Sequence, residues 1–267
     1  MSAALDFAVP LFVPGDRPER FAKAAAAGAD AVIVDLEDAV AAEAKQAARA
    51  ALRSDFGAGP VLVRVNAVGT PWHEADMAAL AGRGFAAVMV PKAEGSEAFA
   101  TLCAKAAMPV IALVESARGL AEVRRIAGLP NLARLAFGSI DFCADLGCAH
   151  SREALLAARS ELVLASRLAG LAAPIDGVTT AIGDGAQISG DARHARDLGF
   201  GGKLCIHPRQ IEAIRAGFAP DEAEILWARK VLASGDGAAA VDGAMVDEPV
   251  RIRARAILRR AQPAAGP

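Results

Sequence analysis

The chain has 267 residues, of which 54% are hydrophobic, and its formal net charge is −2. This length fits one large α/β domain better than two small ones, and the balanced charge excludes the strongly basic character typical of nucleic-acid-binding and membrane-surface proteins. No apolar run approaches the roughly 18–20 residues of a membrane-spanning helix, and residues 1–9 lack the basic and apolar regions of a signal peptide, so we expect a cytoplasmic protein.

Short apolar runs alternate with longer segments rich in alanine and leucine. The runs expected to form β-strands are residues 9–13, 31–35, 61–65, 86–90, 110–114, 132–137, 175–178 and 203–206. The segments expected to form helices are residues 17–27, 42–53, 72–81, 96–106, 120–126, 153–171, 189–197 and 208–216. Continuously apolar strands that alternate with helices are typical of a parallel sheet covered on its faces.

Eight such units within about 210 residues predict an α/β fold of the closed (β/α)₈ TIM-barrel type. An open doubly wound sheet is the alternative. The segment that follows the first run contains Gly15 but no G-x-G-x-x-G motif, which argues against the dinucleotide-binding version of that fold.

A C-terminal extension follows the eighth unit. We therefore divide the chain into a barrel of residues 1–218 and a helical arm or lid of residues 219–267. The extension contains a helical stretch at 221–232, a break rich in glycine and alanine at 233–243, and a basic helical segment at 244–260. A barrel does not need such a segment, so we expect it to cover the site or to reach another subunit.

Polar side chains come where the apolar runs stop. They are Asp35, Glu37 and Asp38, then Arg64, Lys92, Glu115, Asp141, Asp176 and His207. In a barrel enzyme the chemistry lies at the C-terminal ends of the strands. Six acidic side chains and two cations at one rim would contribute little to folding, but they would bind a cation and an anionic substrate well.

Glu115 and Asp141 follow neighbouring strands and are our candidate metal ligands. Alone, Glu115 is more simply explained as a cap of the helix that follows it, and Asp141 as a cap of the turn after the sixth strand. Together they can supply two oxygen ligands to one hard cation, and magnesium takes one or two protein carboxylates and completes its shell with water and substrate oxygens. Glu37 and Asp38 are expected to hold metal-bound waters from behind.

Arg64 ends a buried strand, where a guanidinium needs an anion. Its planar fork matches a substrate carboxylate in two parallel hydrogen bonds, and the alternative is an internal salt bridge to one of the rim acids. Lys92 is a second candidate for binding substrate, although a lysine after a strand-ending proline can also point to solvent. His207 can cap the last helix.

The order and spacing of these residues resemble those of the citrate lyase β-subunit-like proteins of the HpcH/HpaI aldolase superfamily. The matching segments cover nearly the whole chain and are FVPGDRPERF at 12–21, DLEDAV at 35–40, RVN at 64–66, VPKAE at 90–94, VES at 114–116, GSIDF at 138–142, GFGGK at 199–203, IHPRQ at 206–210 and MVDEPV at 245–250.

The resemblance implies a barrel that binds Mg²⁺, with Mn²⁺ as an alternative, acts on acyl-CoA thioesters and forms a trimer or hexamer. The residues that match Glu115 and Asp141 would hold the metal, and the one that matches Arg64 would grip a substrate carboxylate. Arg17, within the first matching segment, is expected to bind substrate together with Lys92.

Two further residues follow from the resemblance. Asp247 matches an aspartate on the C-terminal arm, which in related malyl- and citramalyl-CoA enzymes reaches into a neighbouring subunit's site, and it would act catalytically. Ile140 stands where many relatives have an acidic residue, a departure that bears on substrate choice.

The implied activity is that of a carbon–carbon lyase, or a Claisen-type synthase in reverse. A 3-hydroxyacyl-CoA such as citramalyl-, malyl- or citryl-CoA would give an acyl-CoA and a 2-oxo acid. Two alternatives stay open: an aldolase of the same superfamily that acts on free hydroxy-oxo acids without coenzyme A, and a non-catalytic subunit of a larger lyase complex.

Overall fold

A ring of parallel strands forms the centre of the computed structural model, which describes residues 5–235, 237 and 239–261. The strands are β1 Pro10–Pro14, β2 Ala31–Asp35, β3 Val61–Arg64, β4 Ala87–Val90, β5 Val110–Val114, β6 Leu132–Phe137, β7 Ile175–Asp176 and β8 Gly202–Lys203. They follow one another in chain order around the sheet. The amide of Phe12 donates to the Cys205 carbonyl at 2.8 Å, and the amide of Cys205 donates to the Pro10 carbonyl at 2.9 Å, which closes the ring.

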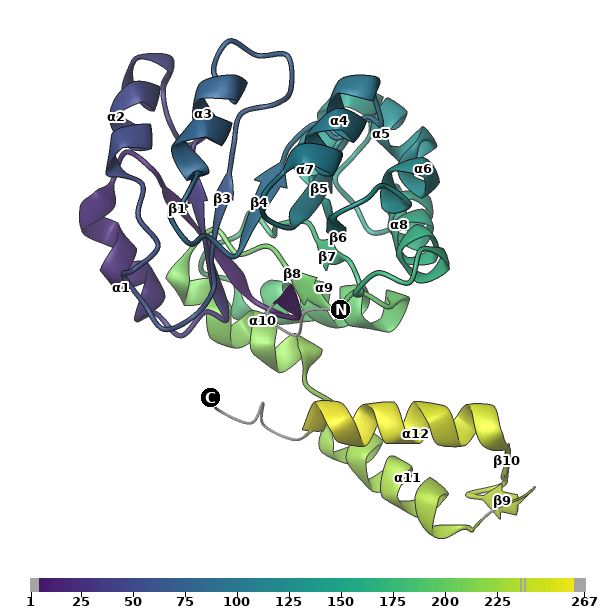
Figure 1. Ribbon diagram of the computed structural model, residues 1–267. Helices are drawn as coiled ribbons and strands as arrows, with labels where there is room; N and C mark the ends of the chain where they lie inside the picture. Colours follow the sequence, from purple (N-terminus) through teal and green to yellow (C-terminus); the bar gives the residue numbers. More distant parts are fainter. Residues whose placement is uncertain (1–4, 236, 238, 262–267) are drawn as a thin grey trace.

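Helices cover the outside of this ring (Figure 1). They are η2 Pro18–Arg20, α1 Phe21–Ala25, η3 Ala42–Ala44, α2 Lys45–Ala51, α3 His73–Leu80, α4 Glu97–Lys105, α5 Ala117–Ala121, α6 Val123–Ala127, α7 Ser139–Leu146, α8 Leu156–Leu168, α9 Gly185–Leu198, η4 Pro208–Gln210 and α10 Ile211–Phe218. The predicted (β/α)₈ TIM barrel with a C-terminal helical arm is confirmed, and the open-sheet alternative is wrong.

Some elements differ from the sequence-based expectation. The helix predicted at 120–126 is two short helices, and β7 and β8 have only two residues each. The segment from Ser139, which we expected to be a turn, is the helix α7, which ends at Gly147 in the left-handed region with φ of 70°. Its first turn contains Asp141, so the tertiary position of the segment after β6 decided its conformation.

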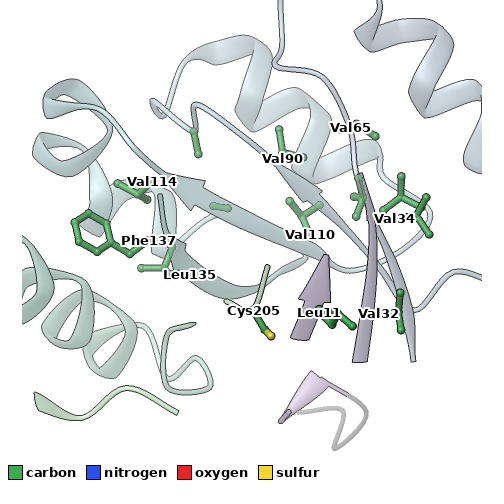
Figure 2. Close-up of a cluster of buried hydrophobic side chains, with 14 of the residues drawn as sticks. Leu11, Val32, Val34, Val65, Val90, Val110, Val114, Leu135, Phe137 and Cys205 are labelled. Atoms are coloured by element: carbon green, nitrogen blue, oxygen red, sulfur yellow. The ribbon is translucent and has the colours of Figure 1, made fainter. Parts of the chain in front are cut away.

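The core has two layers because successive strand residues point to opposite faces of the sheet. Ile33, Leu62 and Leu113 pack inside the barrel. Val34 and Val114 belong to the larger cluster between sheet and helices, part of which Figure 2 shows. Both faces of the strands are thus buried in apolar surroundings, which accounts for their continuously apolar sequences.

The C-terminal arm lies outside the barrel. It consists of α11 Glu222–Ala233, the antiparallel pair β9 Ala239–Val241 and β10 Ala244–Val246, and α12 Glu248–Ala261. The two helices pack side by side, with the hairpin at the end that lies away from the barrel (Figure 1). Arg196 of α9 joins barrel to arm, since its guanidinium donates to the Ala219 carbonyl at 2.7 Å and pairs with Glu224 at 3.1 Å.

The arm has a small core of its own. Ala228 and Val231 of α11 pack against Val246, Ala254 and Ile257 of the hairpin and α12. The hairpin was not predicted, because its strands are only three residues long and fall within the glycine- and alanine-rich break. Among the described residues, no helix is long and apolar enough to cross a membrane.

Candidate active site

Because side chains alternate along a strand, the charged side chains at three strand ends point into the barrel. Leu62 and Leu113 face the barrel interior, so Arg64 and Glu115, two residues further along β3 and β5, point to the same side. The same parity applies to Asp35 at the end of β2, which lies opposite Arg64 in the strand register. The three side chains therefore converge at the C-terminal mouth of the barrel.

A pocket of about 430 Å³ opens at this mouth. Its polar lining residues are Asp35, Asp38, Arg64, Glu115, Ser139 and Asp141. Its other lining residues are Phe12, Pro14, Ala39, Leu113, Phe137, Gly138, Ile140, Val178, Leu204 and Ile206. The pocket thus combines charged groups with a wall of apolar side chains, as small-molecule sites do. A larger cavity of about 740 Å³ lies on the outside, lined by residues such as Met77 of α3 and Leu102 of α4, away from the strand ends.

Arg64 is held by acids of the same rim. Its Nε and Nη2 donate to the two carboxylate oxygens of Asp35, each at 2.7 Å. Its Nη1 lies 3.0 Å from Oε2 of Glu37 and donates to Asp38 at 3.2 Å. The guanidinium also stacks over the ring of Phe12, with 4.9 Å between its central carbon and the ring centroid. The internal salt bridge weighed as an alternative is therefore present in the structure.

These contacts fix both the charge and the orientation of Arg64. Burial alone would lower the pKa of the guanidinium, but the charges of Asp35, Glu37 and Asp38 outweigh it and raise the pKa. The side chain keeps 12% of its surface exposed and lines the pocket. Asp38 is 59% exposed, so of the three acids it is the one that an incoming anion can replace most easily.

Glu115 is a buried carboxylate with few partners. Its Oε1 accepts the backbone amide of Lys92 at 2.8 Å and lies 3.7 Å from the Lys92 ammonium. Burial, followed by the negative charge of Glu37, raises the pKa of Glu115 to about 8, although Lys92 opposes the shift and Asp141 adds to it. A carboxylate in this situation gains strongly from a bound cation.

Gly138 makes room for this carboxylate. A Cβ at position 138 would overlap the Glu115 carboxylate and lie 2.5 Å from the Glu115 Cβ. Asp141 follows one turn into α7 and lines the same pocket. Within the described residues, no group of three or more His, Cys, Asp or Glu side chains forms a metal site. Two carboxylates beside open pocket volume fit a magnesium ion, which keeps several waters.

Lys92 and Glu37 form a bridge behind the pocket. Lys92 has φ of 49°, an uncommon backbone conformation for a non-glycine residue, and its ammonium lies 3.1 Å from Oε1 of Glu37. Glu37 is 8% exposed, and its Oε2 has no hydrogen-bond partner although Arg64 is within ion-pair distance. Burial, the largest influence, raises the pKa of Glu37. Neither side chain lines the pocket; they support Glu115 and Arg64 from behind.

Two predicted site residues lie elsewhere. Arg17 is exposed where the chain leaves β1, and its side chain has no ion-pair or hydrogen-bond partner in the part of the chain that the structure describes. Asp247 follows β10 on the arm, where its Oδ1 accepts the amide of Val250 at 3.2 Å and caps α12. Neither residue lines the barrel pocket of its own chain.

The structure also adds residues that sequence reasoning missed. Phe12 provides the ring under Arg64, and Gly138 provides the space for Glu115. Ser139, buried at the pocket wall, lies 3.0 Å from Nε2 of His150. Phe12 and Gly138 both fall within segments that matched the family pattern, so that pattern was the available signal, but only the fold relates them to Arg64 and Glu115. His207 caps η4 through its Nδ1, as weighed from the sequence.

Known proteins resemble this chain over nearly its full length. Residues 9–208 match the family model described as HpcH/HpaI aldolase/citrate lyase. A citrate lyase subunit beta-like protein of Mycobacterium tuberculosis is 44% identical over 263 residues, which cover 94% of this chain and 94% of that protein. A (3S)-malyl-CoA thioesterase of Cereibacter sphaeroides is 36% identical over 269 residues, which cover 94% of this chain and 93% of that protein.

Similarity to a solved structure extends from sequence to shape. The crystal structure of CitE from Mycobacterium tuberculosis, in complex with magnesium, acetoacetate and coenzyme A, matches with a TM-score of 0.87 and 42% sequence identity. The match covers 97% of this chain and 98% of that one, so it includes both the barrel and the arm.

Proposed function

Because the chain belongs to the HpcH/HpaI aldolase/citrate lyase family and is a carbon–carbon lyase, we propose that its substrate is a 3-hydroxyacyl-CoA such as citramalyl-, malyl- or citryl-CoA. Cleavage gives an acyl-CoA and a 2-oxo acid, and the reverse reaction is a Claisen condensation. The observation that carries the proposal is the convergence of Arg64, Glu115 and Asp141 on one pocket beside an apolar wall.

Glu115 and Asp141 are the residues that would hold a magnesium ion. The solved relative in complex with magnesium, acetoacetate and coenzyme A supports this choice of cofactor and substrate class. When bound, the ion supplies a Lewis acid for the substrate oxygens, and Mn²⁺ can take its place. Glu37 and Asp38 would hold water molecules bound to the ion.

Arg64 binds the free carboxylate of the substrate. Asp35 keeps the guanidinium oriented through two hydrogen bonds, while the exposed Asp38 yields its place on Nη1 to the incoming carboxylate. Lys92 and Arg17 add positive charge for the rest of the thioester. A substrate held in this orientation has already lost much of its freedom of motion on binding. The activation barrier is lower for that reason.

The carbon–carbon bond next to the hydroxyl-bearing carbon breaks after the hydroxyl proton has passed to a base. The electron pair of that bond stays with the thioester fragment, which becomes an enolate, and the former hydroxyl carbon becomes the carbonyl of a 2-oxo acid. The enolate then takes up one proton, which we assign to Asp247. The arm of residues 219–267 thus completes the site of the barrel of residues 1–218.

We propose that Asp247 reaches the site of another subunit, because it lies between β10 and α12 on the arm and does not line the pocket of its own barrel. We therefore propose a homotrimer, or a hexamer built from trimers, in which each arm covers a neighbouring barrel and keeps water from the enolate. We also propose a cytoplasmic location.

A product analysis tests the proposal. The purified protein with Mg²⁺ is given malyl-, citramalyl- or citryl-CoA, and the products are separated by mass spectrometry. Acetyl-CoA together with glyoxylate, pyruvate or oxaloacetate supports cleavage. Asp141→Ala should abolish both magnesium binding and turnover while the circular dichroism spectrum stays that of the folded barrel.

The same experiment separates the other candidates. Malate with free coenzyme A would indicate thioester hydrolysis, the activity that one relative's name describes. Turnover of free hydroxy-oxo acids alone would indicate the aldolase, and binding without turnover would indicate a subunit of a larger complex. Each of these results contradicts the proposed cleavage.

A further inference from the structure

A second polar cavity lies on the same rim, outside the ring of strands. It has a volume of about 170 Å³ and is lined by residues of β8, α8, α9 and the loops that precede α8 and α9. Its lining residues are His150, Ser151, Arg152, Leu155, Arg159, Val178, Thr179, Thr180, Gln187, Asp191, His194 and Lys203. Val178 lines both this cavity and the candidate active site, so a single side chain separates them at that point.

The floor of the cavity carries more positive than negative charge. Arg159 and Lys203 are both buried there, and they share the single carboxylate of Asp176, with distances of 2.8 and 3.0 Å. At the rim, Arg152 pairs with Asp191 at 2.9 Å. Three basic side chains thus face two acids, and the excess cation is in a low-dielectric setting where an unpaired charge is costly.

Two buried polar atoms at this cavity lack partners. Nη1 of Arg159 and Nε2 of His194 are shielded from solvent and make no hydrogen bond within the part of the chain that the structure describes. Arg159 is 6% exposed, lines the cavity and uses its Nε for Asp176, so its Nη1 is an unsatisfied donor on a residue of the cavity wall. Buried polar groups are nearly always satisfied, and each exception needs an explanation.

The pKa values of both histidines that line the cavity are lowered, in part by the same excess of positive charge. Burial, and after it the charges of Arg159 and Lys203, lowers the pKa of His150. Burial, and after it the charges of Arg159 and Arg152, lowers the pKa of His194. Asp176 and Asp191 oppose both shifts without cancelling them. An anion in the cavity would offset the positive potential and accept hydrogen bonds from both rings.

We infer that this cavity binds a small oxyanion of the size of a phosphate group, with Arg159 and His194 as its donors. The volume is several times the roughly 30 Å³ that a water molecule occupies in the liquid, so the cavity holds a group of several heavy atoms. Basic donors around a polar cavity favour phosphate oxygens. This inference does not depend on the lyase reaction.

An anion bound in the cavity would affect the candidate active site through one hydrogen bond. Ser139 lines the substrate pocket and His150 lines the second cavity, and they are 3.0 Å apart. Gly177 packs against Ser139 so closely that any Cβ there would overlap it. A change in the position of the His150 ring is therefore transmitted to the Ser139 hydroxyl.

Inorganic phosphate is the probe for a direct test. We expect saturable binding to the full-length wild-type protein by isothermal titration calorimetry, with a dissociation constant in the millimolar range or below. The double variant Arg152→Gln/His194→Ala should bind roughly tenfold more weakly. These two side chains are partly exposed, whereas a change at Arg159 would break its buried pair with Asp176. Arg193→Gln is the matched control, an exposed arginine adjacent to His194 in α9 that does not line the cavity.

Competition distinguishes the source of the oxyanion. If coenzyme A displaces phosphate and dephospho-coenzyme A does not, the site takes the ribose 3′-phosphate of the thioester. If neither displaces it, the site takes the free anion. The inference is overturned if wild-type protein shows no saturable binding, or if the double variant binds as tightly as the wild type.

Discussion

Arg64 and Asp35 form a two-point ion pair between the ends of neighbouring strands, with both nitrogen–oxygen distances at 2.7 Å. The register that pairs β2 with β3 puts these residues directly opposite each other. Asp35 is 2% exposed and also accepts the amides of Glu37 and Ala39. The guanidinium therefore has one orientation before any substrate arrives, and its Nη1 lies between Glu37 and Asp38.

Replacement of Arg64 by lysine tests this relationship. A lysine keeps the charge but offers no planar fork, so it cannot bind Asp35 at two points and a substrate carboxylate at the same time. We expect Arg64→Lys to lower kcat/KM roughly thirtyfold, which corresponds to a loss of about 2 kcal/mol in transition-state stabilisation. Arg118→Lys, at a side chain that is 78% exposed, is the control. Equal activity of the two variants would contradict the role of Arg64.

Magnesium affinity should depend on pH through Glu115. The folded, metal-free protein keeps Glu115 protonated up to about pH 8, whereas the ordinary value is 4.5. A metal ion binds the carboxylate form, so affinity is weakest at low pH and should rise roughly tenfold per pH unit until it levels off above pH 8. Without metal, the free energy of unfolding should fall as the pH rises from 4.5 to 8, because the folded protein holds a proton on Glu115 that the unfolded chain has released.

Calorimetry of magnesium binding checks this dependence. Titrations at pH 7 in buffers of different ionisation enthalpy should show the release of about one proton per bound ion. Glu115→Gln, which has no proton to release, should bind magnesium weakly and without this buffer dependence. A flat affinity between pH 6 and 8 would rule out Glu115 as a ligand that titrates in this range.

Gly138→Ala should disturb the metal site from the neighbouring strand end. The added methyl group would overlap the Glu115 carboxylate, so the carboxylate must move away from its position beside the pocket. We expect magnesium affinity to fall by at least roughly tenfold and the unfolding free energy to fall by about 1–3 kcal/mol, as overpacking usually costs. Gly183→Ala, where a Cβ meets nothing within 4 Å, should leave both unchanged. An unchanged magnesium affinity in Gly138→Ala would remove Glu115 from the site.

Asp247→Ala should leave substrate binding nearly intact while turnover falls by roughly a hundredfold or more, because it removes the proposed proton donor. The measurement is kcat against the dissociation constant of a substrate analogue. If the arm supplies Asp247 to a neighbouring barrel, mixing Asp247→Ala with inactive Asp141→Ala protein after subunit exchange should restore part of the activity, since some sites then contain both intact residues. Near-normal turnover of Asp247→Ala would contradict its catalytic role, and no restoration would place it within its own chain's site.

Much of the architecture follows from the sequence. Apolar runs at regular spacing predicted the eight strands, and those at 31–35, 110–114 and 132–137 agree with the structure at both ends. The ends of such runs also predicted that Arg64 lies at the barrel mouth, but Asp176, which follows another run, pairs with Arg159 and Lys203 away from that pocket. Glu115 and Asp141 were expected to act together, and they do line one pocket.

Other features of the site depend on contacts that no local pattern reveals. The bond from the Lys92 amide to Glu115 joins residues 23 positions apart, and the pair of Arg64 with Asp35 joins residues 29 positions apart. Lys92 was expected either to bind substrate or to point to solvent, and only the fold shows that its ammonium lies beside Glu37 and Glu115. Helix α7 was missed because its few residues lack a periodic apolar pattern long enough to identify.

The sequence by itself determined the barrel and the direction of its charged strand ends, because strand periodicity and the alternation of strands with helices are local properties of a chain. Only the tertiary structure decided that Arg64 is already bound to Asp35, that Gly138 leaves space for Glu115, and that Arg159 and His194 face a second cavity. These relationships depend on strand register and on the packing of helices over strands, which bring residues far apart in the chain into direct contact.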